Sequence, residues 1–210
     1  MEYIKKLITE GEHQQLDFKF EIKDSRKIAR SISAFANTDG GQLLIGVKDN
    51  GRISGIRSDE EYYMIESAAQ LYCKPEVEIR ATKWMVDNKT VLEINIAKAP
   101  VLPVYVKEEG NKWIAYTRVK DSNIKAGTVQ MQVWKRKLQK KGTFIQISDS
   151  ENKLLKYLEE NEVITLSKTI KLLHLTKKEA EKVLVNLICF NVIEMLHGEK
   201  GMIYKMLKNS

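Results

Sequence analysis

One stretch near the N-terminus constrains the fold of this 210-residue chain more than any other: a helical pattern runs into a glycine pair and then into an apolar strand. The spacing of apolar residues predicts a helix over residues 25–37, capped by Asp24. The nearly continuous apolar run at residues 42–47 is typical of a central strand, and Asp49-Asn50-Gly51 is a strong hairpin signal. The stretch therefore predicts a sheet.

The turn between this helix and strand consists of Asn37, Thr38, Asp39, Gly40 and Gly41. Adjacent glycines allow positive φ angles and a close approach of the backbone, and Asn37 can cap the end of the helix. The turn can be a surface for a phosphate group or a tight helix-to-strand connection, and we favour the connection. It is not a Walker A loop, because no GxxxxGK[ST] pattern occurs in the chain.

The pattern of the sequence changes after Gly142. Before it, strand-like alternation dominates and closes with a basic helix from about Thr128 to Gln139; after it, three helical segments and two strand-like segments follow. Helix, helix, helix, hairpin is the order of elements in a winged helix-turn-helix. We therefore expect an α+β fold, with a mixed-sheet domain at residues 1–142 and a small winged-helix domain at residues 148–210.

The best-defined helix begins at the capping-box spacing Thr176-Lys177-Lys178-Glu179. In a helix-turn-helix the second helix lies in the major groove, so its lysines would meet phosphates and its asparagine a base edge. We expect its outward face to carry Lys178, Glu181, Lys182, Val185 and Asn186. The residues expected to contact DNA are Lys177, Lys178, Lys182 and Asn186 on this helix and Lys200 at the tip of the hairpin. Winged helices are also protein-interaction modules, and residues 148–210 are barely basic, with ten Lys against nine Asp or Glu.

The formal net charge of +7 is concentrated in one segment. Residues 112–141 contain nine Lys or Arg against one acid, Asp121, which gives this segment a net charge of +8. A clustered excess of positive charge attracts a polyanion with salt-dependent affinity, although it can also be a solvated helix face. The basic residues of the segment are Lys112, Arg118, Lys120, Lys125, Lys135, Arg136, Lys137, Lys140 and Lys141.

Two segments resemble the Schlafen/AlbA family. EGEHQQLDFKFEI at residues 10–22 has an acidic residue before Phe-Lys, and ISAFANTDGGQLLIGVKDNGRISGI at residues 32–56 has the family's Ala-Phe-Ala-Asn-Thr-x-Gly-Gly turn followed by Ile-Gly-Val. The likeness weakens after Gly55, but later strand-like segments extend it over roughly residues 1 to 140. The resemblance implies a DNA-binding domain of the Schlafen/AlbA type at the N-terminus.

The same resemblance implies an alternative, because some Schlafen-type proteins are described as RNA-cleaving enzymes with clustered carboxylates. Glu12 and Asp17 have the family's Glu-x4-acid spacing, and Asp49 follows Ile-Gly-Val. Three such carboxylates can hold Mg²⁺ or Mn²⁺ and activate water, or they can be exposed turn and strand-end acids. Asp17 replaces the commoner Glu, and the family's zinc-type Cys/His cluster is absent from a chain with two Cys and three His.

These patterns lead to one leading hypothesis and two alternatives. We expect a cytoplasmic, bacterial-type DNA-binding transcriptional regulator without a cofactor, since no run approaches the roughly 18 apolar residues of a membrane helix and the first residues lack a signal-peptide core. A homodimer would suit a helix-turn-helix, and RNA is an alternative partner. The competing functions are a metal-dependent endoribonuclease and a protein-interaction adaptor.

Overall fold

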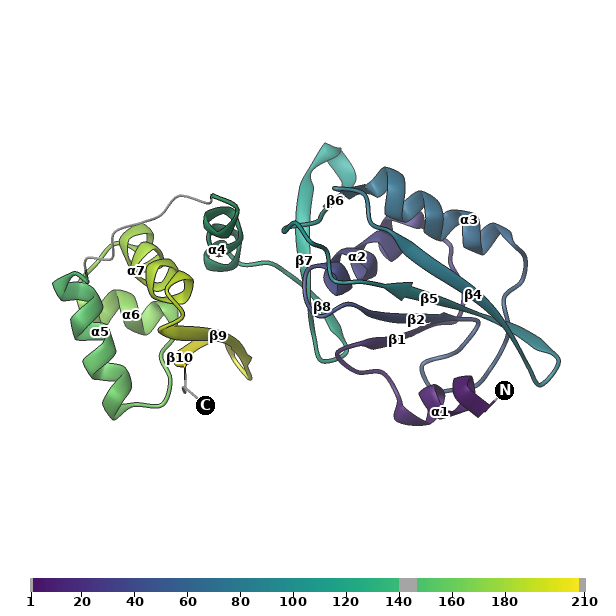
Figure 1. Cartoon of the computed structure of the whole chain (residues 1–210), viewed down its shortest axis with the longest axis horizontal. Coiled ribbons are helices and arrows are strands. Elements are labelled where there is room, and N and C mark those ends of the chain that lie inside the picture. Colours follow the sequence, from purple (N-terminus) through teal and green to yellow (C-terminus); the bar gives the residue numbers. More distant parts are fainter. Residues whose placement is uncertain (1, 140–146, 208–210) are drawn as a thin grey trace. The chain divides into compact units, whose positions relative to one another are not determined.

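The structure, a computed structural model, describes residues 2–139 and 147–207. By its internal contacts the chain divides into an N-terminal unit, Met1–Ala126, and a C-terminal unit, Gly127–Ser210 (Figure 1). Helices and strands occur in both units, so the fold class is α+β, as predicted. Among the described residues, no helix has the length and apolarity needed to cross a membrane.

The N-terminal unit contains two four-stranded sheets. The first has the order β1-β2-β5-β4, with β1 parallel to β2 and the other pairs antiparallel; the second, β3-β6-β7-β8, is antiparallel throughout. The strands are β1 (Leu16–Lys19), β2 (Gly41–Ile45), β3 (Cys73–Lys74), β4 (Ile79–Val86), β5 (Lys89–Ile96), β6 (Tyr105–Lys107), β7 (Trp113–Val119) and β8 (Ser122–Lys125). The helices are α1 (Glu2–Glu10), α2 (Ser25–Ala36) and α3 (Glu60–Ser67), with a π-helical turn at Ala68–Tyr72 and a 3-10 turn at Glu109–Asn111.

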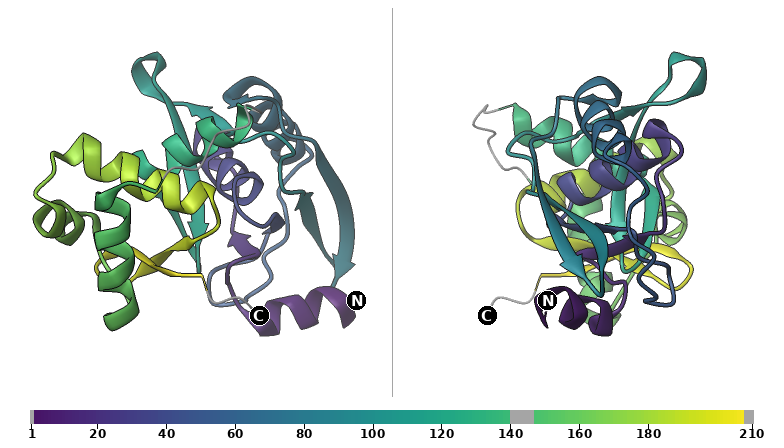
Figure 2. Two further views of the ribbon diagram at one scale, coloured as in Figure 1. Left: turned by 60° about the vertical axis from the view of Figure 1, so that its left-hand side comes forward. Right: turned by 90° about the vertical axis from the view of Figure 1, so that its right-hand side faces the viewer.

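Helix α2 lies at the centre of this unit (Figure 2). Its buried residues join one core cluster with residues of both sheets. Phe35 belongs to this cluster together with Leu43 and Ile45 of β2. Because side chains alternate along a strand, Leu44 points to the other face of the first sheet, where it packs in a cluster with Ile4 of α1. The apolar run predicted as a central strand is therefore buried on both faces.

In its described residues, 127–139 and 147–207, the C-terminal unit has four helices and an antiparallel hairpin. Its elements are α4 (Thr128–Leu138), α5 (Asp149–Glu160), α6 (Leu166–Leu173), α7 (Lys177–Cys189), β9 (Ile193–Gly198) and β10 (Gly201–Met206). Capping boxes begin α5 at Ser148 and α7 at Thr176, and the second was predicted from its spacing. After α4, the order of elements is three helices followed by a hairpin, which is the predicted order.

The structure places the boundary between Ala126 and Gly127, whereas the sequence pattern placed it between residues 142 and 148. The reason is the packing of α4: Val129 and Val133 belong to the same core cluster as Leu184 of α7, so the basic helix is part of the C-terminal unit. This shift changes the distribution of charge. Residues 127–210 contain 15 Lys or Arg and 9 Asp or Glu, a net charge of +6, while residues 1–126 contain 20 and 19, a net charge of +1.

Candidate nucleic-acid interface

The N-terminal half of α7 presents lysines to solvent, as predicted. Lys178 and Lys182 are exposed and one helical turn apart, and neither forms an ion pair with a residue in the described ranges. Lys177 is also exposed, with its Nζ 4.0 Å from an oxygen of Glu181. This half of the helix therefore offers ammonium groups that can meet phosphate oxygens.

Helix α4 covers another part of the face that was predicted to be outward. Glu181 is only 6% exposed, because Thr128 Oγ1 donates to its Oε1 at 2.5 Å and Gln132 Nε2 donates to its Oε2 at 2.9 Å. Val185, one turn later, is buried as well. The face left open on α7 is therefore narrower than the sequence suggested.

Asn186 does not have the free amide that reading a base edge requires. Its Oδ1 accepts a hydrogen bond from Arg136 of α4, and its Nδ2 donates to Glu151 Oε1 of α5 at 2.7 Å. The guanidinium of Arg136 also lies over the ring of Phe190, 5.4 Å from its centroid. Asn186 and Arg136, both predicted to contact nucleic acid, instead join three helices of the unit.

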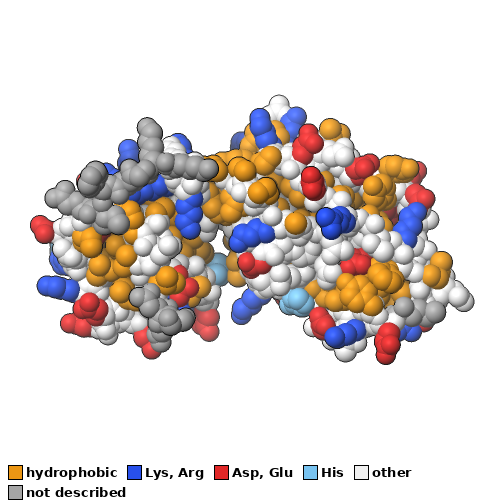
Figure 3. Space-filling view, viewed as in Figure 1, with side chains coloured by type: hydrophobic (Ala, Val, Ile, Leu, Met, Phe, Trp, Pro, Cys, Tyr) orange, Lys and Arg blue, Asp and Glu red, His pale blue; other side chains and the backbone are white. Residues whose placement is uncertain are grey.

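The other predicted basic contacts of this unit divide into two groups. Lys135 and Lys137 near the end of α4, and Lys200 in the hairpin, are exposed and form no ion pair within the described part of the chain. Figure 3 shows Lys and Arg side chains, in blue, on the visible face of this unit. Lys140 and Lys141 lie outside the described residues.

In the N-terminal unit, the basic segment contains one residue with a different role. Lys112, Lys120 and Lys125 are exposed, but Arg118 on β7 is only 2% exposed. Arg118 Nη2 lies 3.2 Å from Asp17 Oδ1 of β1, and its guanidinium lies 4.9 Å from the centroid of the Phe35 ring.

Further hydrogen bonds complete the surroundings of Arg118. Its Nη1 donates to Asn123 Oδ1 at 3.1 Å, and its Nη2 donates to the carbonyl oxygens of His13 at 3.3 Å and Leu16 at 3.2 Å. The prediction that Arg118 contacts nucleic acid is therefore contradicted, because this residue links strands inside the unit. Strand alternation offered a signal for it: Tyr116 and Arg118 are two positions apart and both are buried.

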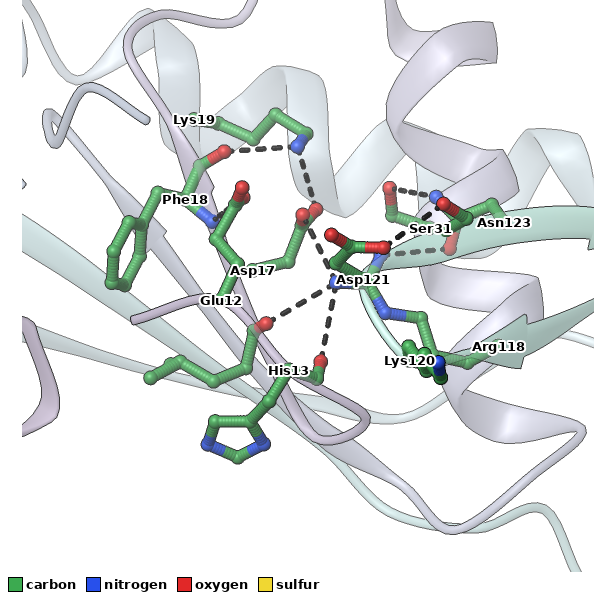
Figure 4. Close-up of polar contacts among 12 residues, drawn as sticks. Glu12, His13, Asp17, Phe18, Lys19, Ser31, Arg118, Lys120, Asp121 and Asn123 are labelled. Atoms are coloured by element: carbon green, nitrogen blue, oxygen red, sulfur yellow. Dashed lines mark hydrogen bonds and ion pairs between the residues drawn. The ribbon is translucent and has the colours of Figure 1, made fainter. Parts of the chain in front are cut away.

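The three predicted carboxylates do not form one cluster. Asp17 is buried, and its Oδ2 lies 2.6 Å from Lys19 Nζ, while Glu12 Oε1 accepts the backbone N–H of Phe18 at 2.8 Å (Figure 4). Burial, and then the neighbouring Asp17, raise the pKa of Glu12. Asp49 lies apart in the turn after β2, and no three His, Cys, Asp or Glu side chains among the described residues are arranged to hold a metal ion. The predicted three-carboxylate metal site is therefore not formed.

The glycines of the Asn37–Gly41 turn are explained by packing. A Cβ atom at Gly41 would lie 2.4 Å from the Phe35 ring, and one at Gly40, where φ is +71°, would lie 2.7 Å from the carbonyl oxygen of Ile96. A cavity of about 520 Å³ opens beside the turn. Its lining has no excess of positive charge, since it contains Glu10, Asp39 and Glu78 as well as Arg80 and Lys98. These contacts favour the tight connection over a phosphate site.

Asn37 and Thr38 of this turn bind to the second sheet. Asn37 is 5% exposed; its Nδ2 donates to the carbonyl oxygens of Val104 at 2.9 Å and Tyr116 at 2.8 Å, and its Oδ1 accepts the N–H of Val104 at 2.7 Å. Thr38 Oγ1 accepts the backbone N–H of Arg118 at 3.0 Å. The polar groups of the turn are thus used to hold α2 against β6 and β7.

Two solved structures are similar to this chain. The DIP2311 protein of Corynebacterium diphtheriae shares 21% identity at a TM-score of 0.46, with 90% of this chain and 34% of that chain covered, so this chain spans about a third of that protein. The N-terminal domain of a Nitrosomonas europaea protein, named as related to the ATP-dependent DNA helicase RecG, shares 25% identity at a TM-score of 0.44, with 57% of this chain and 90% of that chain covered.

A match to a family model shows which family this chain belongs to. The model described as Schlafen, AlbA_2 matches residues 12–127, which is more than half of the chain. The matched range contains the Asn37–Gly41 turn and the buried Asp17–Arg118 pair, and it ends at the boundary between the two units. This chain therefore belongs to the Schlafen AlbA_2 family.

Proposed function

We propose that this protein binds double-stranded DNA through its C-terminal unit and acts as a DNA-binding regulator. The observation that carries the proposal is the pair Lys178 and Lys182, exposed one turn apart near the start of α7 and without ion-pair partners among the described residues. In a helix-turn-helix, the corresponding part of the second helix faces the major groove and the flanking phosphates. Membership of the Schlafen AlbA_2 family supports a nucleic-acid partner.

The distribution of charge supports the same unit as the binding surface. With α4 included, the C-terminal unit has a net charge of +6, compared with +1 for the N-terminal unit. Lys135, Lys137 and Lys200 add exposed ammonium groups to those of α7. A positive excess of this size attracts the DNA backbone. Binding releases counterions from the DNA, so the affinity depends on the salt concentration.

The contacts in this proposal are mainly with phosphates. Asn186 uses its amide within the unit, and Glu181 and Val185 lie under α4, so few side chains of α7 are left to read base edges. Phosphate contacts fix the position of a protein on DNA without selecting a sequence. We therefore expect substantial affinity for random duplex DNA.

A salt titration of the full chain on random duplex DNA tests this function. The variant Lys178→Ala/Lys182→Ala removes the two α7 ammonium groups; its matched control, Lys153→Ala/Lys156→Ala, removes two exposed lysines from α5. The plot of log affinity against log salt should become less steep by about 1.8 for the α7 variant, because each phosphate contact contributes about 0.9 to the slope. The control should keep the slope of the unaltered protein.

Three outcomes would overturn the proposal. Equal slopes for the two double variants would show that α7 does not meet phosphates. An absence of binding by the unaltered protein at moderate ionic strength would favour the protein-interaction adaptor. Tighter binding to single-stranded or structured RNA than to duplex DNA would replace DNA by RNA as the partner.

A further inference from the structure

A cavity within the C-terminal unit shares only Lys200 with the proposed DNA contacts. It has a volume of about 390 Å³ and lies between the first turn of α4, the start of α6 and the β9–β10 hairpin. Small-molecule sites usually have volumes of about 300 to 1,000 Å³ and a largely apolar lining with a few polar groups. The apolar side chains that line this cavity are Val129, Leu166, Met195, Met202 and Tyr204.

Tyr204 provides an unpaired polar group in this lining. The residue is only 2% exposed, yet its hydroxyl forms no hydrogen bond with any described residue, although buried tyrosines usually have a partner. Tyr204 lines the cavity, so a molecule bound there can supply the partner that its hydroxyl lacks.

The state of this hydroxyl makes it a hydrogen-bond donor. Burial first, and the nearby Glu181 second, raise the pKa of Tyr204 to about 12, so the hydroxyl keeps its proton at neutral pH. Both oxygens of Glu181 already accept hydrogen bonds from Thr128 and Gln132 of α4. A ligand atom that accepts a hydrogen bond would give the Tyr204 hydroxyl a partner.

Two further features of the lining favour a negative charge on that ligand. Lys200 lines the cavity and forms no ion pair among the described residues. The first turn of α4 also lines it, and Gly127, the N-cap residue, supplies no side-chain cap, so backbone N–H groups there are open. At the start of α6, by contrast, Thr165 caps the helix by accepting the N–H of Lys168.

We propose that this cavity binds a small aromatic carboxylate. Its ring lies among Met195, Met202 and Leu166, since flexible thioether side chains adapt well to aromatic rings. Its carboxylate accepts a hydrogen bond from the Tyr204 hydroxyl and forms an ion pair with the ammonium group of Lys200. The site is separate from the exposed lysines of α7, so it stands whether or not the protein binds DNA.

The test uses the full chain with ¹³C-labelled methionine methyl groups and 1-naphthoate as the probe. The NMR signals of Met195 and Met202 should shift with saturation, whereas those of Met64 and Met85 in the N-terminal unit should stay in place. The neutral isostere 1-naphthamide should bind at least about tenfold more weakly, which corresponds to the loss of one charge-assisted hydrogen bond. No saturable shift of Met195 and Met202 at millimolar naphthoate would overturn the proposal.

Two variants separate the parts of the site. Tyr204→Phe keeps the ring and removes the hydroxyl, so the affinity for naphthoate should fall about two- to tenfold. Lys200→Gln should weaken naphthoate and leave naphthamide unchanged. Equal affinity for the acid and the amide in the unaltered protein would overturn the anionic assignment, and equal shifts at Met64 and Met85 would show adsorption to the surface. Unchanged Met64 and Met85 signals in each variant show that the chain has folded.

Discussion

The two units of this protein differ in how they use their charged side chains. The N-terminal unit has a net charge of +1 and buries Arg118 against Asp17, so its most enclosed cation connects strands. The C-terminal unit has a net charge of +6, buries the acids Glu151 and Glu181 between helices, and leaves most of its lysines in solvent. The count of basic residues in a segment therefore does not by itself locate a binding surface.

The basic segment at residues 112–141 illustrates the difference. The sequence presents these basic residues as one continuous segment, but the boundary between Ala126 and Gly127 divides the segment between the two units. Its first part contains the buried Arg118, whereas its second part contains α4, whose Lys135 and Lys137 remain exposed. Only the second part adds free positive charge to the helices that we propose as the DNA-binding surface.

The largest effect that would separate the two units is expected at Arg118. Arg118→Met keeps an apolar stem on β7 but leaves Asp17 buried without its guanidinium partner, which should destabilise the N-terminal unit by about 3–5 kcal/mol. Hydrogen exchange of the β7 amides in the full chain measures this change. Lys120→Met, two residues later and exposed, should change the stability by less than about 0.5 kcal/mol. Equal effects of the two changes would contradict the structural role of Arg118.

A smaller effect is expected at Glu181 in the C-terminal unit. Glu181→Ala removes the acceptor of Thr128 and Gln132, so the attachment of α4 to α7 should weaken by about 1–3 kcal/mol. The amides of α4 should then exchange faster with solvent, while those of β1 in the N-terminal unit should be unaffected. Glu159→Ala on the exposed face of α5 is the control. Unchanged exchange in α4 would show that apolar packing alone holds this helix.

Much of the fold could be predicted because its signals are local. The helix expected at residues 25–37 is α2 (Ser25–Ala36), and the basic helix expected from about Thr128 to Gln139 is α4 (Thr128–Leu138). Apolar periodicity and capping boxes depend on neighbours three or four positions apart, so one sequence contains them. That pattern does not show against which neighbour an amphipathic helix packs. For this reason the sequence pattern puts the domain boundary after α4, whereas the structure puts it before α4.

The sequence predicted residues of the candidate site correctly only where the exposure of a side chain decides its role. Lys178 and Lys182 were expected to be exposed and are exposed. Asn186 and Arg118 have partners that are distant in the sequence: Asn186 contacts Arg136, and Arg118 contacts Asp17. A local pattern can indicate the face on which a residue lies, as strand alternation does for Arg118, but it does not identify a partner that is distant in the sequence.

The smallest effect concerns Glu12, beside the buried pair of the N-terminal unit. Burial and Asp17 raise the pKa of Glu12 above its value in the unfolded chain. The protonated form of Glu12 therefore stabilises the folded protein at pH values below the unfolded-state pKa, and this contribution is lost as the pH rises through the raised value. Glu12→Gln keeps an acceptor for the Phe18 N–H and removes the titration, so its stability relative to the unaltered protein should rise between pH 4 and pH 7. The gain should be at most about 1 kcal/mol, because Glu12 is partly solvated. Urea unfolding at both pH values measures it, with the exposed Glu76→Gln as the control. A difference between Glu12→Gln and the unaltered protein that is the same at both pH values would show that neither burial nor Asp17 raises the pKa of Glu12. The contrast between a unit with paired charges and one with free charges would then rest on Arg118 alone.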